Sequence, residues 1–456
     1  MRRLAFPAIL HSLLQTFVFV VDRVMLGHHA DVSLAAMQIA GPLEWSVWSI
    51  FAAFEVGTIA RVGRHVGAGR PDEARRAAWV SFCLAAVMGS LVALASPFVV
   101  LHLHDFAPRS SPEAIAAARD YLQITLAASP MVFIGVTAIA VLQAGGDTRT
   151  PLVIGAFVNA IHIPLNRVMI LGAFGLPALG PRGCAMSTAF TFTLQAGLAI
   201  LALSRRGRAV SLHRTESMKS AGLGRRSGLG AEAKEVMRIG APAFVERVLY
   251  HAGYVGFVLI IALLGDRAMA ANQALISAES ICFLSADGFG IAAAALVAQK
   301  LGAERPDEAE ASARIAAFYA IGLLSTAGLA FLAFRSLILS AFTTDPAIVA
   351  VGAAAVPILA LAQPFMAIGT VLGQSLRGAG FTRDVLVVSA ISALGVRIAT
   401  TWLFAIVLGM GLTGVWLGST CDWVARTILL VIVGRVRARS LRSAMEPGGL
   451  ARTTPA

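Results

Sequence analysis

Charged residues are scarce in this chain of 456 residues. Lys, Arg, Asp and Glu together make up 14% of the sequence, whereas soluble domains carry about 25%. Hydrophobic residues reach 57%, and the mean hydropathy is +0.77. Apolar runs recur with short gaps between them, and each has about the 20 residues that a helix needs to cross a bilayer. The sequence therefore excludes an ordinary soluble globule and predicts an integral membrane protein without a large extramembrane domain.

Cysteine is also rare, and a nucleotide-binding motif is absent. The cysteines lack the close spacing of a metal or redox site, so we expect small buried hydrophobic residues and no bound metal. No Gly-x-x-x-x-Gly-Lys-Ser/Thr sequence occurs, and that loop is what cradles the phosphates of ATP in many pumps. The sequence therefore disfavours an ATP-driven pump and predicts no organic cofactor. The cysteines are Cys83, Cys184, Cys282 and Cys421.

The apolar runs predict an all-α fold of twelve transmembrane helices. At a rise of about 1.5 Å per residue, each run is long enough for a hydrocarbon layer of about 30 Å. The first run follows a basic start, but Pro7, Asp22 and the lack of an Ala-x-Ala site favour a membrane helix over a signal peptide. The predicted spans are 4–27, 40–62, 77–104, 118–143, 151–174, 183–203, 239–264, 273–299, 313–342, 350–375, 385–409 and 412–434.

The two halves of the chain repeat each other. The pentapeptide Arg-Pro-Asp-Glu-Ala at 70–74 returns unchanged at 305–309, and the same separation of 235 residues relates Glu44 to Glu279. Because this offset contains six predicted spans, both copies enter the membrane from the same side. The sequence thus predicts two parallel six-helix bundles, related by a pseudo-twofold axis along the membrane normal and enclosing a central cleft. The predicted parts are an N-terminal bundle (1–204), a basic flexible linker (205–238), a C-terminal bundle (239–434) and a basic tail (435–456).

The net charge of +12 comes from basic residues in alternate loops, in the linker and in the tail. Cytoplasmic loops of membrane proteins carry such an excess of Lys and Arg. We therefore expect a multi-pass protein of the cytoplasmic (inner) membrane with both termini in the cytoplasm. The basic loops are expected to contact anionic lipid rather than nucleic acid.

A few acidic residues lie inside predicted spans, where an unpaired charge costs about 2.5–3.5 kcal/mol. Asp22 follows five apolar residues of the first span, and a carboxylate there can hold a proton or bind a cation. The alternatives for Asp22 are a pair with adjacent Arg23 and a position at the membrane interface. Glu246 and Glu279 are candidates to line a cavity in the second half, and the alternatives are a pair with Arg247 and a position near the membrane surface.

Other ionisable residues in the spans have a lower rank. Glu44, Glu55 and Asp287 are second-rank candidates for lining a substrate cavity. Asp422 and Arg426 are four residues apart on the last span, a spacing that predicts a structural ion pair.

Three further polar residues in the spans are predicted to be structural. Arg397, like Asp422 and Arg426, is expected to have a structural role. His162 and His251 stand alone in apolar surroundings, so we expect buried polar residues rather than zinc ligands.

Several short motifs occur in a fixed order along nearly the whole chain. They are Pro7 and Asp22 with Met25-Leu26-Gly27, then Val66-Gly67-Ala68-Gly69, the stretch from Leu142 to Pro151, Leu376-Arg377-Gly378-Ala379-Gly380 and Gly414-Val415-Trp416. In this order and with this duplication they resemble the multidrug and toxic compound extrusion (MATE) family of cation-coupled antiporters. The resemblance implies two helical bundles that alternate between outward-open and inward-open states while exchanging a proton or sodium ion for an organic substrate.

The resemblance also implies roles for particular residues. The acid that the family carries on its first helix falls on Asp22, and its polar partners fall on Asn159 and Thr188. A further Asp of some members would fall on Ile163 here, so the first-bundle site departs from their pattern. Because acids of the second bundle are used in another bacterial branch, Glu246 and Glu279 join the candidates for cation coupling.

The leading hypothesis is a secondary antiporter of the multidrug-efflux type, working as a monomer on small organic compounds. The alternative is a flippase for a lipid-linked saccharide or other amphipathic lipid, although the charges in the spans are mainly acidic and such proteins usually have a more cationic cavity. An intramembrane enzyme is disfavoured because no catalytic pair is evident on the predicted spans. No motif names the substrate, since broad specificity depends on the shape of a cavity.

Overall fold

The structure is a computed structural model that describes residues 2–106, 111–173, 175–205, 209–212, 226–340 and 345–445. Much of the predicted linker (206–208 and 213–225) and the last part of the predicted tail (446–456) lie outside the described residues. The described residues form helices joined by short turns, and no strand occurs among them. The all-α prediction is therefore confirmed.

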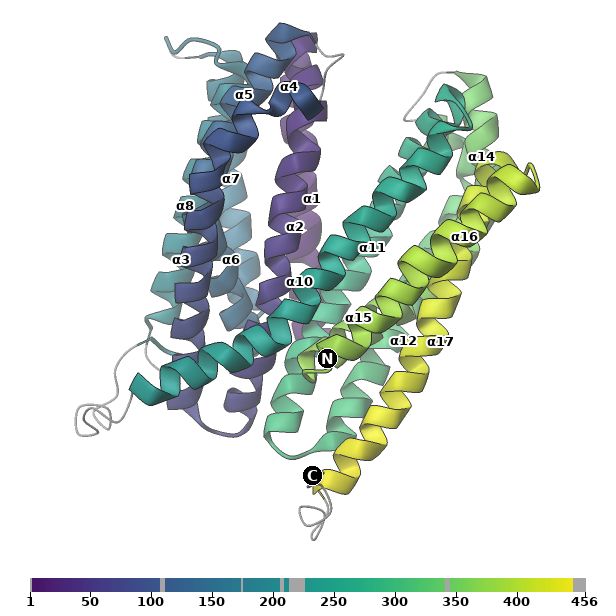
Figure 1. Ribbon diagram of the computed structural model, residues 1–456. Helices are drawn as coiled ribbons and strands as arrows, with labels where there is room; N and C mark the ends of the chain where they lie inside the picture. Colours follow the sequence, from purple (N-terminus) through teal and green to yellow (C-terminus); the bar gives the residue numbers. More distant parts are fainter. Residues whose placement is uncertain are drawn as a thin grey trace. The chain divides into compact units, whose positions relative to one another are not determined.

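The chain divides into two compact units. The N-terminal unit is Leu10–Arg238, and the C-terminal unit is Ile239–Ala456 together with Met1–Ile9. Helices α1 to α8 lie mainly in the N-terminal unit: α1 (Arg2–His29), α2 (Asp31–Gly67), α3 (Pro71–Leu101), α4 (Leu103–Phe106), α5 (Pro112–Ala127), α6 (Ser129–Ala144), α7 (Arg149–Leu171) and α8 (Gly180–Leu203). Figure 1 shows that the long helices of this unit run side by side.

The C-terminal unit has a similar series of helices. They are α10 (Arg226–Ala262), α11 (Asp266–Gly302), α12 (Pro306–Ala333), α13 (Arg335–Ser340), α14 (Pro346–Gly378), α15 (Thr382–Ala390), η1 (Ile391–Val396), α16 (Arg397–Trp402), η2 (Leu403–Val407) and α17 (Gly411–Met445). Helix α10 begins in the N-terminal unit and continues into the C-terminal unit.

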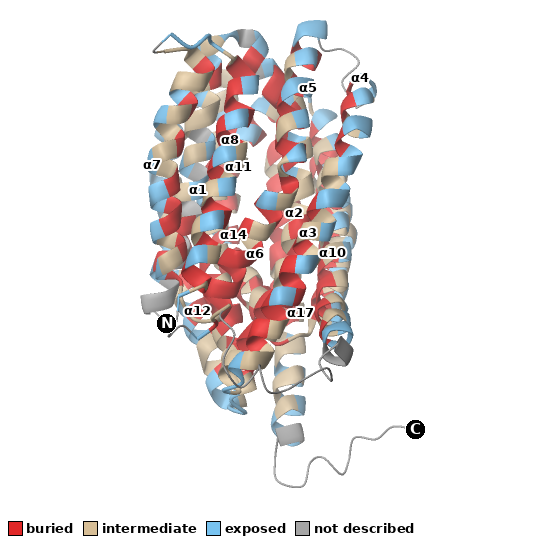
Figure 2. Cartoon of the chain, turned by 90° about the vertical axis from the view of Figure 1, so that its left-hand side faces the viewer, coloured by how far each residue is buried: buried red, intermediate tan, exposed pale blue. Residues whose placement is uncertain are grey.

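Nine helical spans of the described chain are long and apolar enough to cross a membrane, or ten if α5 and α6 count as one span. Helices α1 and α2, with 28 and 37 residues, bring the number of long helical segments to the twelve that the sequence predicts. Large apolar side chains such as Leu94 and Phe318 are 77% and 73% exposed, as expected of surfaces that face lipid. Figure 2 shows exposed residues along the outer faces of the helices.

The repeat is visible in the helices themselves. Helices α2 and α11 both have 37 residues, and their first residues, Asp31 and Asp266, are 235 residues apart. Helices α3 and α12 begin at Pro71 and Pro306, each followed by an acidic pair in the first turn. Proline suits this position because its missing N–H would have no partner there, and the acids favour the positive end of the helix.

Three predicted segments differ from the structure. The predicted span 118–143 is a bent pair, because α5 and α6 meet at 53° where Pro130 cannot donate a backbone hydrogen bond. The predicted span 385–409 contains two π-helical segments, η1 and η2. The last part of the predicted flexible linker, from Arg226 onward, is the helical beginning of α10.

The π-helical segments accompany a close approach of α17. A Cβ atom at Gly418 would lie 2.4 Å from the hydroxyl oxygen of Thr401, and one at Gly414 would lie 2.6 Å from the carbonyl carbon of Phe404. Both glycines therefore let α17 reach the backbone of the irregular span. This packing places Arg397, the first residue of α16, against the middle of α17.

Two cysteines differ from the prediction. Cys184 and Cys282 are buried, but Cys421 is only half-buried and Cys83 is exposed. Its side chain lies on a membrane helix, α3, where lipid provides an environment as apolar as a core. Such a position tolerates a small apolar side chain without burial by protein.

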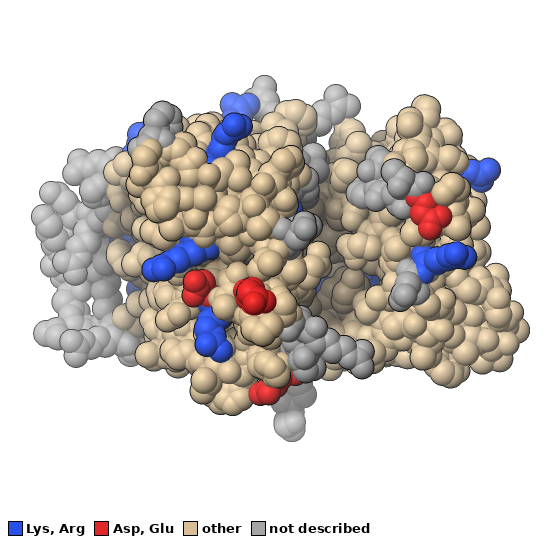
Figure 3. Space-filling view, turned by 90° about the horizontal axis from the view of Figure 1, so that it is seen from above, with Lys and Arg blue, Asp and Glu red and all other residues tan. Residues whose placement is uncertain are grey.

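Ion pairs join helix ends within each unit. In the N-terminal unit Arg61 of α2 pairs with Glu232 at the start of α10. In the C-terminal unit Arg442 near the end of α17 pairs with Asp307 at the start of α12. The face drawn in Figure 3 shows mostly uncharged surface with scattered Lys, Arg, Asp and Glu.

Candidate functional site

Asp22 of α1 is held by polar side chains of α7. Its two carboxylate oxygens lie 3.0 and 3.1 Å from Nε2 of His162, and Nδ2 of Asn166 donates to one of them at 2.6 Å. The side chain of His162 is 4% exposed and that of Asp22 is 15% exposed. The carboxylate that the sequence singled out is therefore part of a buried hydrogen-bonded cluster inside the membrane.

Helix α8 extends this cluster. Nδ1 of His162 lies 3.0 Å from the hydroxyl oxygen of Thr191, and the hydroxyl group of Ser187 donates to Oδ1 of Asn166 at 2.5 Å. Asp22, His162, Asn166, Ser187 and Thr191 are named the Asp22 cluster below. It links α1 to the consecutive helices α7 and α8, and Asp22 and His162 are 140 residues apart in the sequence.

The helical period explains why these residues meet. His162 and Asn166 are four residues apart on α7, and Ser187 and Thr191 are four apart on α8, so each pair lies on one face of its helix. The cluster was not predicted from the sequence, in which His162 stands as an isolated polar residue. The sequence does contain a pattern that indicates the cluster: each of two neighbouring spans carries a pair of polar residues four positions apart.

The two partners that the resemblance implied lie on the same helices. Asn159 is half-buried on α7, and Thr188 is buried on α8. The side chains that contact Asp22 are His162 and Asn166 instead. The roles of Asn159 and Thr188 in coupling stay predictions.

Arg23 does not form the pair that was one alternative for Asp22. Its guanidinium group donates to the backbone carbonyl of Met37 at 3.2 Å and stacks over the ring of Phe19, 4.7 Å from its centre. Adjacent residues on a helix point in different directions. Asp22 therefore forms its hydrogen bonds with side chains of α7 and not with Arg23.

Glu246 of α10 has an arginine partner. Nη2 and Nε of Arg377 donate to its two oxygens at 2.5 and 3.1 Å, and the hydroxyl group of Ser389 donates at 2.7 Å. The partner is thus Arg377 of α14 and not the neighbouring Arg247. A buried carboxylate with a two-point guanidinium contact keeps its charge permanently matched, which favours a structural role.

Glu279 and Glu44 occupy equivalent positions of the repeat and share one property. Each has a buried Oε1 atom without a hydrogen-bond partner among the described residues. The other oxygen of Glu44 accepts a hydrogen bond from the hydroxyl group of Tyr121 at 2.8 Å. A half-satisfied carboxyl group in each unit is costly as an anion, so both residues remain candidates for carrying a proton.

Asp422 is fully buried between two arginines. Arg397 lies 2.6 Å from one oxygen, and Arg426 lies 3.4 Å from the other. The structure therefore shows the pair with Arg426, but Arg397 is the closer partner. Its guanidinium group also lies over the ring of Phe257, 5.5 Å from the centre. This cluster joins α10, α16 and α17.

The two remaining second-rank candidates lie on equivalent helices. The amide of Gln374 donates to Asp287 of α11 at 2.7 Å, and Glu55 is a half-buried residue of α2. These observations do not place Asp287 or Glu55 at a substrate site. Their predicted place at a substrate cavity stays a prediction.

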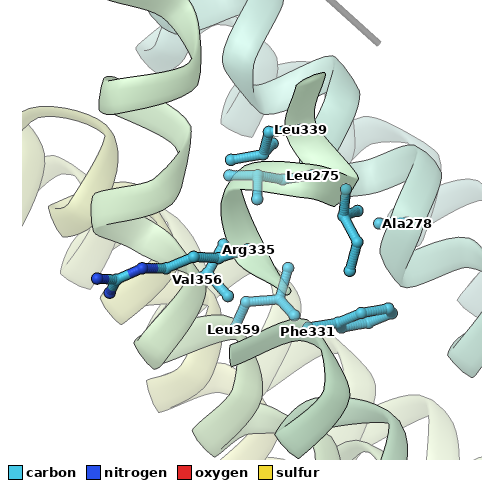
Figure 4. A pocket seen from close by; sticks show the side chains of 8 residues that line it. Leu275, Ala278, Phe331, Arg335, Leu339, Val356 and Leu359 are labelled. Atoms are coloured by element: carbon cyan, nitrogen blue, oxygen red, sulfur yellow. The ribbon is translucent and has the colours of Figure 1, made fainter. Parts of the chain in front are cut away.

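A pocket in the C-terminal unit is almost entirely apolar. Figure 4 shows the apolar side chains around it, with the guanidinium group of Arg335 directed away from them. No acid lines it, so it offers nothing to a coupling ion. The residues around it are Leu275, Ala278, Phe331, Arg335, Ile338, Leu339, Val356 and Leu359.

Comparison with known families finds the repeat again. The family model described as MatE matches residues 7–168 and, a second time, residues 242–403. The second match begins 235 residues after the first, which is the offset of the pentapeptide. Together the two matches cover more than half of the chain.

Relatives and solved structures extend over nearly the full length. A "probable multidrug resistance protein NorM" of Thermotoga maritima is 27% identical over 434 residues, covering 94% of this chain and 90% of that protein. The multidrug resistance protein MdtK of Pectobacterium atrosepticum is 25% identical over 442 residues, covering 94% and 93%.

Among solved structures, a variant of the Vibrio cholerae MATE transporter VcmN aligns with a TM-score of 0.85 at 17% identity, covering 97% of this chain and 96% of that one. A Pyrococcus furiosus transporter of the MOP superfamily aligns at 0.84 and 19%, covering 96% and 95%. The fold is that of these transporters, which have twelve helices in two bundles.

Proposed function

Since this chain belongs to the MATE family of multidrug efflux transporters, we propose that it is a secondary active antiporter. It exports organic compounds, often cationic or amphipathic, in exchange for protons or sodium ions. It works in the cytoplasmic membrane with both termini in the cytoplasm, as a monomer and without a cofactor. The comparisons do not favour lipid flipping.

The observation that supports exchange is the Asp22 cluster. Its carboxylate lies inside a membrane helix, yet it contacts amide and imidazole groups rather than a permanent cation. Such a carboxylate can gain and lose an ion, whereas one paired with arginine cannot do so cheaply. Because Asp22 joins α1 to α7, filling and emptying it changes the interactions between these helices. An ion drives transport only if it binds one conformation more tightly than the other.

Transport from proteoliposomes tests this proposal. The full chain is reconstituted, and efflux of ethidium and two other fluorescent organic cations is recorded under an imposed pH gradient or sodium gradient. We expect gradient-driven efflux by the native chain and a loss of about tenfold or more in Asp22→Asn, the size of a typical coupling between linked sites. Glu279→Gln tests the candidate in the other unit.

The matched control is His28→Gln. His28 lies on the same helix, but its side chain is exposed and bonded to the carbonyl of Val24. This variant should transport like the native chain. The role of Asp22 is wrong if Asp22→Asn retains native efflux under both gradients.

A further inference from the structure

We propose that the coupling ion is a proton shared between the carboxylate of Asp22 and Nε2 of His162, an inference that rests on the proposed exchange function. The shared proton is the link between α1 and α7. His162 is thereby a partner of Asp22 in ion coupling and more than a buried polar residue.

The hydroxyl group of Thr191 fixes one nitrogen of the imidazole. Its O–H donates to the backbone carbonyls of Ser187 at 2.8 Å and Thr188 at 3.1 Å. A hydroxyl group has a single hydrogen, so Thr191 presents a lone pair to Nδ1 of His162, 3.0 Å away. Nδ1 therefore carries a hydrogen.

The other nitrogen faces only acceptors. Nε2 lies 3.0 and 3.1 Å from the two oxygens of Asp22, and an ionised carboxylate has no hydrogen to donate. The contact is attractive only with one proton between the two groups, on Nε2 or on the carboxyl group. Without that proton, the lone pair of Nε2 faces the negative charge of Asp22 at hydrogen-bond distance. The arrangement in the structure is thus that of the proton-loaded pair.

Asn166 completes an environment of N–H donors. Its Nδ2 donates to Oδ1 of Asp22 at 2.6 Å, and its own oxygen accepts from Ser187. The amide of Asn166 is oriented so that its N–H group faces the carboxylate of Asp22 and its oxygen faces the hydroxyl group of Ser187, which gives each hydrogen bond one donor and one acceptor. Small hard cations are bound by several oxygen atoms, but the side chains on Asp22 present N–H groups, whose positive ends repel a cation. The composition of the cluster therefore selects a proton over sodium.

The other ionisable groups near the pair have their own partners or are neutral. Arg23 of α1 is directed to the carbonyl of Met37. Glu44 of α2 and Tyr121 of α5 are bonded to each other. Cys184 of α8, buried as a free thiol, contacts Asn166 at 3.8 Å. Among these groups, the carboxyl group of Glu44 still has an Oε1 atom without a partner among the described residues, and it is the one that competes with Asp22 and His162 for a proton.

Nuclear magnetic resonance of the full chain tests the shared proton without any substrate. Histidines are labelled with ¹⁵N, the chain is placed in lipid bilayers, and the His162 signal is assigned by its absence in His162→Gln. We expect its Nε2 resonance to show a pH-dependent step and to stay unchanged when sodium is added at fixed pH. Asp22→Asn should displace or abolish this step, while the control His28→Gln leaves it in place.

Transport in the same bilayers supplies the second readout. The amide of His162→Gln can still donate to Asp22, but it cannot carry the shared proton. We expect proton-driven ethidium efflux to fall about tenfold or more in this variant, with the protein still folded, and no efflux from a sodium gradient in the native chain. The proposal is overturned if the Nε2 resonance of His162 changes when sodium is added, or if it stays constant from acidic to alkaline pH.

Native-like proton-driven efflux by His162→Gln overturns it too. If no gradient drives efflux of any tested cation by the native chain, the exchange function fails for those compounds. The resonance step still decides whether Asp22 and His162 share a proton.

Discussion

At the scale of single residues, the partner of an acid decides what the acid can do. Asp22 faces an imidazole and an amide, whereas Glu246 faces the guanidinium group of Arg377. Both acids lie in membrane helices, and both were predicted from the sequence as candidates for cation coupling. A guanidinium group stays charged at any physiological pH and holds its carboxylate as an anion. Imidazole and amide partners leave Asp22 free to exchange an ion.

Removing the charge of Glu246 should therefore damage stability before it affects coupling. In Glu246→Gln the guanidinium group of Arg377 loses its partner in a mostly buried place, which we expect to cost about 3–5 kcal/mol. Arg377→Gln should cost a similar amount. Thermal unfolding of both variants and of the double variant measures this.

The double variant provides the control, because it leaves no lone charge. Its loss should be clearly smaller than the sum of the two single losses, as for any pair in direct contact. Strictly additive losses would show that the two side chains do not interact in the membrane.

The sequence predicted the acids better than their partners. An acid inside an apolar run is conspicuous on its own, so Asp22 and Glu246 were found from the sequence. Their partners are 140 and 131 residues away, and neither contact leaves a local pattern. The neighbours Arg23 and Arg247 were weak alternatives on geometric grounds, because consecutive helical residues do not face each other.

At the scale of elements, the start of α10 shows how a segment read as a linker is held. Arg61 of α2 donates to both oxygens of Glu232 at 2.8 and 2.7 Å, and His65 lies 3.4 Å from the same carboxylate. A Cβ atom at Gly57 would lie 2.5 Å from the carbonyl oxygen of Val236. The first turns of α10 are therefore docked on α2.

This docking predicts protection of the backbone at 229–238. We expect slow amide hydrogen exchange there in the native chain and clearly faster exchange in Glu232→Ala, since the mostly buried Arg61 then lacks its partner. Hydrogen-exchange mass spectrometry follows these peptides. Glu235→Ala is the control, because the side chain of Glu235 is 36% exposed and forms its ion pair with Arg238 on its own helix. Equal exchange in native chain and Glu232→Ala would mean that the ion pair does not dock the segment.

The glycines of α17 make a second prediction about elements. Gly418→Ala would push a methyl group against the backbone of Thr401, whose Cα and N atoms would be 2.6 Å away. Overpacking of this kind costs about 1–3 kcal/mol, so the variant should unfold at lower temperature. Gly434→Ala on the same helix meets nothing within 4 Å and should be neutral or more stable by up to about 1 kcal/mol, the difference in helix propensity. Equal melting temperatures of the two variants would contradict the role of close packing.

Hydropathy predicted where helices lie but not how they are interrupted. The bend between α5 and α6 follows from Pro130, a residue that can be read from the sequence. The segments η1 and η2 have no such marker, because they depend on the contacts of Gly414 and Gly418 with a neighbouring helix. The helical start of α10 was missed since basic and small residues before it are typical of loops.

At the scale of the whole molecule, helix ends show which loops lie on the same side. In the C-terminal unit, Arg442 near the end of α17 pairs with Asp307 and Glu310 at the start of α12. The loop between α11 and α12 and the end of α17 thus share one side of the membrane. This loop corresponds in the repeat to the loop between α2 and α3, and both contain the sequence Arg-Pro-Asp-Glu-Ala.

The positive-inside rule predicts that this side is cytoplasmic, and labelling of single added cysteines checks it. Glu304→Cys and Ser443→Cys are expected to react with a membrane-impermeant maleimide only after the cells are opened. Leu176→Cys, in the exposed loop between α7 and α8, should react in intact cells. The native cysteines lie within long membrane helices and provide the unlabelled background. Labelling of Glu304→Cys or Ser443→Cys in intact cells would reverse the orientation, and a substrate bound for export would then have to enter from the other end of the helices.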